Sequence, residues 1–203
     1  YYIRPVMGVT DKITYQYITT EYDGNSDTVI VRNPYNYNFP GRVLFITASE
    51  NSRSFTCDRT EFFGINGSSA VPEAMEREKL LNRAGGGFDP CAAIQVEVSL
   101  EAGEEKKVVF LLGESVSKEE ALKLTEKFKN VQKAEREFER LRNYWIMKLG
   151  SVKVSTPDPS MDILLNGWLL YQVVSCRLWA RSAFYQSGGA YGFRDQLQDV
   201  MAV

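Results

Sequence analysis

The first half of the chain alternates apolar and polar residues in short runs, which is the pattern of β-strands that bury one face. The run Ile94–Leu100 has apolar residues at every second position, and so does Lys106–Leu112. The glycine-containing stretch 101–105 between them predicts that the two runs form a hairpin. Three earlier segments fit the same pattern: Lys12–Thr19, Thr28–Arg32 and Arg42–Ala48. Short strands separated by turns predict an antiparallel β-sandwich.

The alternation stops between Cys57 and Pro90. This excursion contains charged and aromatic residues at Asp58–Phe63 and three consecutive glycines at 85–87. A long excursion inside a compact sandwich is either a functional loop or a disordered one, and the aromatic and paired-charge content predicts an ordered one. No Lys-Ser/Thr pair follows the glycines, so they do not form a nucleotide-type phosphate loop.

At Ser117 the apolar spacing changes to three and four residues, which is the spacing of one helical face. Ser117 and Glu120 have the spacing of a capping box, and Gly150 is a suitable stop. The apolar stripe comprises Ala121, Leu124, Phe128, Val131, Ala134, Phe138, Leu141 and Trp145. The pattern predicts one helix roughly 45 Å long that joins two domains. A coiled-coil segment is the less favoured alternative.

A second break follows at Thr156–Ser160, where two prolines bar a continuous helix. Asp158 with Pro159 favours a helix start at this point. The next stretch, 161–182, predicts a helix that is apolar around most of its circumference. Such a helix has to be covered by other helices. We therefore expect the covering layer to lie beyond Val203, and the chain to be a piece of a longer polypeptide.

Composition and charge exclude several classes of function. The net charge of -2 gives no basic surface for nucleic acid. The sequence contains no histidine, which rules out Ser-His-Asp and Cys-His catalysis within it and removes the commonest metal ligand. Its three cysteines are widely spaced and odd in number, which predicts reduced, buried thiols. No signal segment or membrane span is evident, so we expect a cytoplasmic location.

The last part of the sequence carries the strongest candidate site. A glycine-rich loop leads into a segment with Arg194, Asp195, Gln198 and Asp199. If this segment is helical, Arg194 and Gln198 share one face and the two aspartates share another nearby. Carboxylates that accept and a guanidinium that donates paired hydrogen bonds suit the vicinal hydroxyls of a sugar. Carboxylates four residues apart lie on the same side, which favours substrate binding over paired catalysis. The spacing alone also fits an ordinary helix start with solvated charges.

Several stretches resemble glycoside hydrolase family 94, whose members are inverting phosphorylases such as cellobiose phosphorylase. Within the family, the sequences of these stretches are most similar to 1,2-β-oligoglucan phosphorylase and to the phosphorylase-like domain of cyclic β-1,2-glucan synthase. The stretches that carry the resemblance are Asp58–Phe62, Phe88–Ala93, Asn166–Gln172, Trp179–Gln186 and Ser187–Asp199.

The resemblance implies a β-sandwich over 1–115, a helical linker over 116–157 and the first part of an (α/α)6 barrel over 158–203. It implies cleavage of β-glucan oligosaccharides by inorganic phosphate to give α-glucose 1-phosphate, with no cofactor. Arg194, Asp195, Gln198 and Asp199 would be sugar ligands on the non-reducing side of the cleaved bond.

The general acid and the phosphate ligands would lie in the remainder of the catalytic domain, outside this chain, so no catalytic residue is assigned and the fragment alone is expected to be inactive. The resemblance is also compatible with a homodimer. It leaves two other functions open: the chain-length-controlling domain of a membrane-bound cyclic glucan synthase, and a non-catalytic carbohydrate-binding module. The loop 58–61 either reaches an active site or is simply fixed to the sandwich by Arg59 and Glu61.

Overall fold

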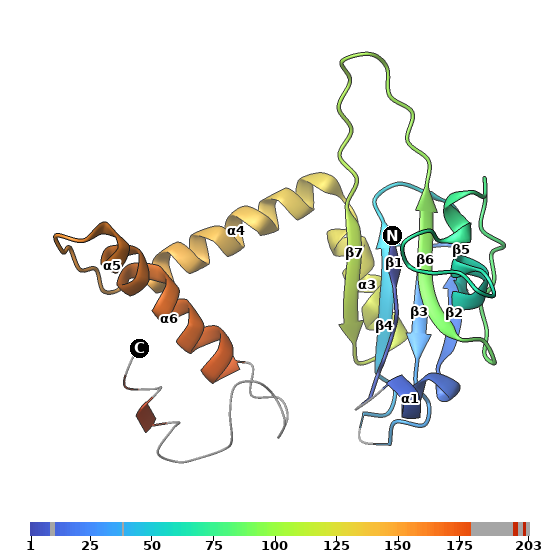
Figure 1. The fold of residues 1–203 in the computed structure, drawn as a ribbon, viewed down its shortest axis with the longest axis horizontal. Coiled ribbons are helices and arrows are strands. Elements are labelled where there is room, and N and C mark those ends of the chain that lie inside the picture. Colours follow the sequence, from blue (N-terminus) through green and yellow to red (C-terminus); the bar gives the residue numbers. More distant parts are fainter. Residues whose placement is uncertain (9–10, 38, 180–196, 199–200, 202–203) are drawn as a thin grey trace. The chain divides into compact units, whose positions relative to one another are not determined.

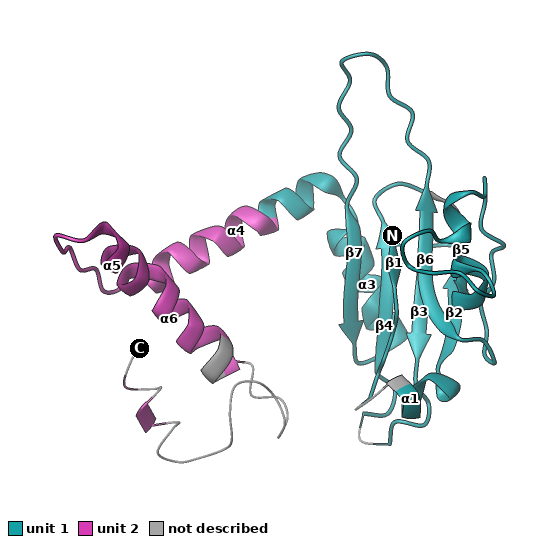
Figure 2. Cartoon of the chain, viewed as in Figure 1, with its two compact units in different colours: residues 1–136 teal, residues 137–203 magenta. Residues whose placement is uncertain are grey.

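The computed structural model describes residues 1–8, 11–37, 39–179, 197–198 and 201. The chain forms two compact units, residues 1–136 and residues 137–203 (Figure 1, Figure 2). The first unit contains the β-structure, and the second is helical.

Two antiparallel sheets form the first unit, as the sequence predicts. Among the described residues, one sheet has the strand order β1-β6-β5 and the other has the order β2-β3-β4-β7 (Figure 1). The strands are β1 (Tyr2–Ile3), β2 (Thr19–Asp23), β3 (Thr28–Arg32), β4 (Val43–Ala48), β5 (Ser52–Asp58), β6 (Pro90–Val96) and β7 (Phe110–Ser115).

The main core lies between the two sheets, and a second core lies on the outer face of the larger sheet. The first core comprises Ile18, Val29, Val31, Ile46, Ala48, Phe55, Cys57, Ala92 and Ile94. The second core comprises Ile30, Val43, Phe45 and Ala121, the last of which belongs to helix α3 (Lys118–Phe128). Because β3 contributes to both cores, its three central residues are all apolar and fully buried.

The predicted strand at Lys12–Thr19 is wrong. Its residues form helix α1 (Asp11–Thr14) and the 3₁₀ turn η1 (Tyr15–Tyr17), and the first long strand begins only at Thr19. The Thr14 hydroxyl donates to the Val6 carbonyl at 2.5 Å, and the Tyr17 ring stacks on Tyr35 with centroids 3.9 Å apart. These contacts fix a turn where the residue alternation alone favours a strand.

The predicted hairpin between 94–100 and 106–112 is also wrong, because β6 and β7 belong to different sheets. Both edges of β6 are already occupied, by β1 and by β5. β7 pairs instead with β4, from Val43 opposite Ser115 to Ala48 opposite Phe110. Residues 97–107 are a solvent-exposed part of the connection between the two sheets.

The predicted long helix is two helices, α3 and α4 (Val131–Leu149), with a break at residues 129–130. The Ser117 hydroxyl accepts from the backbone N–H of Glu120 at 3.3 Å, as the capping box predicts. The Asn130 side chain accepts from the backbone N–H of Lys133 at 3.2 Å. Asparagine favours such caps over a helix interior, which explains why a new helix starts here. Gly150 follows the end of α4, as predicted.

The second unit contains a helix that begins where the prolines predict. The Asp158 carboxylate accepts from the backbone N–H of Ser160 at 2.9 Å and caps the first turn. Four segments follow one another without a break, and η3 and η4 are π-helical. They are α5 (Pro159–Ile163), η3 (Leu164–Trp168), α6 (Leu169–Gln172) and η4 (Val173–Trp179).

Candidate functional site

The predicted sugar ligands fall at the edge of what the structure describes. Arg194, Asp195 and Asp199 lie outside the described residues. Gln198 lies inside them, is helical together with Leu197, and is exposed to solvent. The assignment of these four residues to a sugar site therefore stays a prediction.

The helix 159–179, which precedes this segment in the sequence, exposes apolar side chains. Trp168 and Trp179 are each more than half exposed, and Ile163 is 72% exposed. Within α5, η3 and α6, which the structure describes completely, no residue is buried. This agrees with the expectation that such a helix requires a covering layer.

An aromatic cluster joins α4 to this helix within the second unit. The Trp145 ring lies 4.9 Å from Tyr171 and 5.4 Å from Trp179 between ring centroids. Nearby on α4 is a shallow hollow of about 300 Å³, which is lined by Tyr144, Met147, Lys148 and Ser151. It holds one charged group, the Lys148 ammonium.

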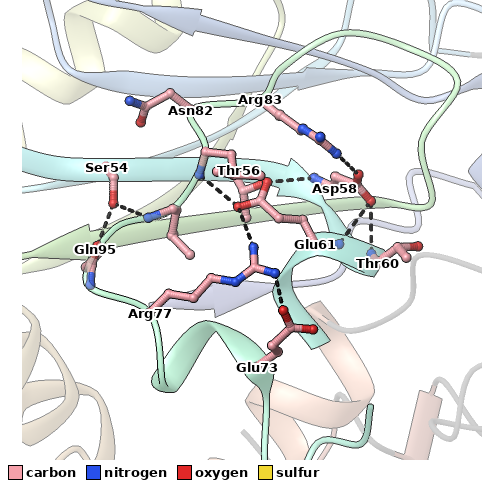
Figure 3. A network of polar contacts seen from close by, with 12 residues as sticks. Ser54, Thr56, Asp58, Thr60, Glu61, Glu73, Arg77, Asn82, Arg83 and Gln95 are labelled. Carbon is pink, nitrogen blue, oxygen red and sulfur yellow. Dashed lines mark hydrogen bonds and ion pairs between the residues drawn. The ribbon is translucent and has the colours of Figure 1, made fainter. Parts of the chain in front are cut away.

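The excursion between β5 and β6 is ordered, as predicted, and a polar network holds it (Figure 3). Its helical parts are α2 (Arg59–Phe63) and η2 (Glu73–Met75). The Asp58 carboxylate accepts from the backbone N–H groups of Thr60 and Glu61, and caps α2. Its other oxygen accepts from Arg83 at 3.0 Å.

Glu61 is the buried centre of this network, since its side chain is only 2% exposed. One carboxylate oxygen accepts from the backbone N–H of Leu81 at 2.8 Å, and the other accepts from the Thr56 hydroxyl (Figure 3). Arg77 lies 3.9 Å away and also pairs with Glu73 on the surface. The Glu61 carboxylate thus holds the returning part of the excursion against β5.

Further side chains fix the same segment. The Ser54 hydroxyl donates to Gln95 at 2.5 Å and accepts from the backbone N–H of Leu80 at 2.9 Å. The Asn82 side chain accepts from the backbone N–H of Phe55 at 3.0 Å. Sequence reasoning did not identify these partners, because they come from three separate segments that only the pairing of β5 and β6 brings together.

Arg59 is bound on the outer side of the excursion. Its guanidinium donates to Asp89 at 3.2 Å and lies 4.8 Å from the centre of the Phe63 ring. Of the two interpretations of the loop 58–61, the contacts of Glu61 and Arg59 favour attachment to the sandwich. Both side chains have structural partners within the first unit.

The two cysteines of the sandwich are free and buried, as predicted. Burial raises the pKa of the Cys57 thiol to about 11, and burial also raises the pKa of the Cys91 thiol. Both thiols are therefore protonated at neutral pH and weakly reactive.

The residues that the structure describes include neither a cluster of metal-ligating side chains nor a helix able to cross a membrane. In that part of the chain, no group of three or more Cys, Asp or Glu side chains is placed to hold a metal ion. None of its helices is long and apolar enough to cross a membrane.

Comparison with known proteins gives matches over nearly the whole chain. The model of the glycosyl hydrolase 94 supersandwich domain matches residues 1–131, and that of the glycosyl hydrolase 94 superfamily catalytic domain matches residues 144–203. A cyclic β-(1,2)-glucan synthase NdvB of Rhizobium meliloti (strain 1021) is 35% identical over 202 residues, which are 99% of this chain and 7% of that protein.

Two phosphorylases are also similar. An N,N'-diacetylchitobiose phosphorylase of Vibrio proteolyticus is 27% identical over 162 residues, covering 78% of this chain and 20% of that protein. A solabiose phosphorylase of Paenibacillus borealis is 27% identical over 192 residues, covering 92% of this chain and 24% of that protein. The chain thus spans less than a quarter of the length of each of these relatives. With one family model on the sandwich and another on the helical unit, the chain belongs to glycosyl hydrolase family 94.

Proposed function

We propose that this chain is part of an inverting glycoside phosphorylase that cleaves β-1,2-linked glucan oligosaccharides with inorganic phosphate to give α-glucose 1-phosphate. The observation that carries this proposal is the succession of a supersandwich match and a catalytic-domain match in one chain, among relatives that are named as phosphorylases. The choice of β-1,2 linkages rests on the similarity to a cyclic β-(1,2)-glucan synthase over 99% of the chain.

In this proposal Arg194, Asp195, Gln198 and Asp199 bind the glucosyl residue on the non-reducing side of the cleaved bond. Each carboxylate accepts hydrogen bonds from two hydroxyls, and the guanidinium donates a pair. The helix 159–179 becomes part of an (α/α)6 barrel, whose further helices cover the apolar side chains that are exposed in this chain.

The chemistry requires two changes at the anomeric carbon. An oxygen of inorganic phosphate forms a bond to this carbon from one side while the glycosidic C–O bond breaks on the other, so a β-linkage gives an α-phosphate. A carboxylic acid donates its proton to the departing oxygen. Phosphate is itself the nucleophile, so the reaction needs no cofactor. We place the acid and the phosphate ligands outside this chain, and we assign no catalytic residue within it.

A second function is favoured by one specific match. The relative that aligns with 99% of the chain is a cyclic glucan synthase, so the chain could instead be the domain that controls chain length in such an enzyme. Membrane-spanning helices in the complete polypeptide would favour this function over a free oligoglucan phosphorylase.

A non-catalytic carbohydrate-binding module is a third function. Release of glucose 1-phosphate that depends on phosphate would exclude it.

The test is to incubate the complete polypeptide with phosphate and β-1,2-, β-1,3- and β-1,4-glucans and to measure glucose 1-phosphate. We expect release from the β-1,2-glucan, and no release from any glucan would overturn the proposal.

Asp199→Ala is expected to raise the KM for the glucan without unfolding the protein. Glu139→Ala, which removes an exposed carboxylate of α4, is the matched control and should leave KM unchanged. Unaltered kinetics in Asp199→Ala would remove Asp199 from the sugar site.

A further inference from the structure

The linker 150–157 joins α4 to the helix 159–179, and the Asn166 side chain holds it by the hydrogen bonds that a neighbouring β-strand would form. The Asn166 amide, on η3, accepts from the backbone N–H of Val154 at 2.8 Å and donates to the Val154 carbonyl at 2.8 Å. One side chain therefore satisfies both backbone groups of one linker residue, as a neighbouring strand would. This contact gives a structural role to the first residue of the motif at 166–172.

A second side chain of the same helix fixes the linker two residues further on. The Asp162 carboxylate accepts from the backbone N–H of Thr156 at 2.8 Å. The Thr156 hydroxyl donates to the Asp158 carbonyl at 2.9 Å, and Asp158 caps the helix. Linker residues 154, 156 and 158 are therefore bound in succession, and we call the contacts of Asn166 and Asp162 the linker clamp.

The first turns of the helix rely on this clamp, because the aromatic contacts with α4 lie further along the helix, at Tyr171 and Trp179. Gly167 lies near its middle, where glycine disfavours a helix, and apart from its chain neighbours and the adjacent helix backbone no described atom lies within 4 Å of the position that a Cβ would take. The segments α5, η3 and α6 have no buried residue. Removal of the clamp is therefore expected to loosen both the linker and the first turns of the helix.

We propose that Asn166 and Asp162 are positioning residues. They lock the linker 150–157 onto the helix, and they thereby fix the start of the helix that precedes the segment 194–199 in the sequence. The consequence for sugar binding rests on the proposed function, whereas the rigidity of the linker does not.

The first measurement is hydrogen exchange in the complete polypeptide, without substrate, for peptides that cover residues 150–158. Asn166→Ala and Asp162→Ala are expected to speed exchange of the linker amides about fivefold for each hydrogen bond lost. Asp162→Asn keeps an oxygen that accepts from Thr156 and should exchange like the unaltered protein. Asn166→Asp keeps the acceptor for the Val154 N–H but loses the donor, so intermediate exchange is expected.

The second measurement is steady-state phosphorolysis. In the two alanine variants the KM for β-1,2-glucan is expected to rise several-fold while kcat stays within about twofold, and Asp162→Asn should restore the original KM. Linker exchange in the alanine variants that is as slow as in the unaltered protein would overturn the clamp. Faster exchange in these variants with an unchanged KM would overturn the positioning role. If the unaltered protein releases no glucose 1-phosphate, the proposed function fails, and the exchange rates still decide whether the clamp exists.

Discussion

Replacing Glu61 with alanine should release the excursion 59–89 from the sandwich. The carboxylate is buried and accepts two hydrogen bonds, from the Leu81 backbone and from the Thr56 hydroxyl. Hydrogen bonds to a charged group contribute about 1.5–3 kcal/mol each, and loss of the acceptor leaves both donors without a partner. Arg77 adds little, because it is partly exposed and is already paired with Glu73. We therefore expect Glu61→Ala to cost about 3–5 kcal/mol.

Glu61→Gln is expected to cost less, about 1–2 kcal/mol. Its amide oxygen can still accept from Leu81, and its NH₂ group then faces the Thr56 hydroxyl. That hydroxyl already accepts from the backbone N–H of Asp58 at 3.2 Å. If it also accepts from the new NH₂ group, its own O–H is left without an acceptor. Glu73→Ala, which removes an exposed partner of Arg77, is the matched control and should cost less than about 0.5 kcal/mol.

The assay is far-ultraviolet circular dichroism during urea unfolding, combined with hydrogen exchange of peptides that cover residues 76–84. The three tryptophans of the sequence, at 145, 168 and 179, all lie in the second unit, so their fluorescence reports on that unit independently. We expect faster exchange at 76–84 in Glu61→Ala, with unchanged tryptophan fluorescence. Protection in Glu61→Ala equal to that of the unaltered protein would refute the role of this carboxylate.

Two substitutions and one labelling experiment test the packing of the sandwich. Gly113→Ala should destabilise it by about 1–3 kcal/mol, because the added Cβ would lie 2.3 Å from the Phe45 ring. Thermal unfolding of this variant measures the clash, and the double variant with Phe45→Leu should relieve it. Thr125→Val should stabilise it by about 1 kcal/mol, since the buried Thr125 hydroxyl has no hydrogen-bond partner among the described residues, and a lower urea midpoint would contradict this. The thiols of Cys57 and Cys91 should resist iodoacetamide at pH 8 in the folded protein, because burial raises both pKa values, and mass spectrometry should detect their modification only after unfolding.

Local sequence was sufficient where the structure depends on neighbouring residues. The strand 28–32, the caps at Ser117 and Asp158 and the end of α4 follow from side chains within a few positions. It was insufficient where distant segments compete for a partner. The alternation at 94–100 and 106–112 does not show that both edges of β6 are taken by strands far away in the sequence.

The candidate site shows the same division. The resemblance identified the family. The Asp58–Phe62 motif marked a segment in which the Glu61 side chain is buried and both of its carboxylate oxygens accept hydrogen bonds. The side chains that hold the rest of the excursion, Ser54, Asn82 and Gln95, have no distinctive spacing, so no local pattern could have identified them. The sugar-binding role of Arg194, Asp195, Gln198 and Asp199 stays a prediction, because three of these four residues lie outside the part of the chain that the structure describes.

The pairing of β1 with β6 has a consequence for synthesis on the ribosome. Tyr2 lies opposite Ala93 in β6, so the smaller sheet is not complete until about residue 96 has emerged, and the larger sheet, in which β4 lies beside β7, is not complete until about residue 115. Translation at about 5–20 residues per second takes on the order of ten seconds to pass from β1 to β7. Of the described strands, β2, β3 and β4 form a meander that can pair earlier from local contacts. Its apolar surfaces stay exposed to solvent during this interval, and nascent chains stalled before residue 90 should therefore bind chaperones.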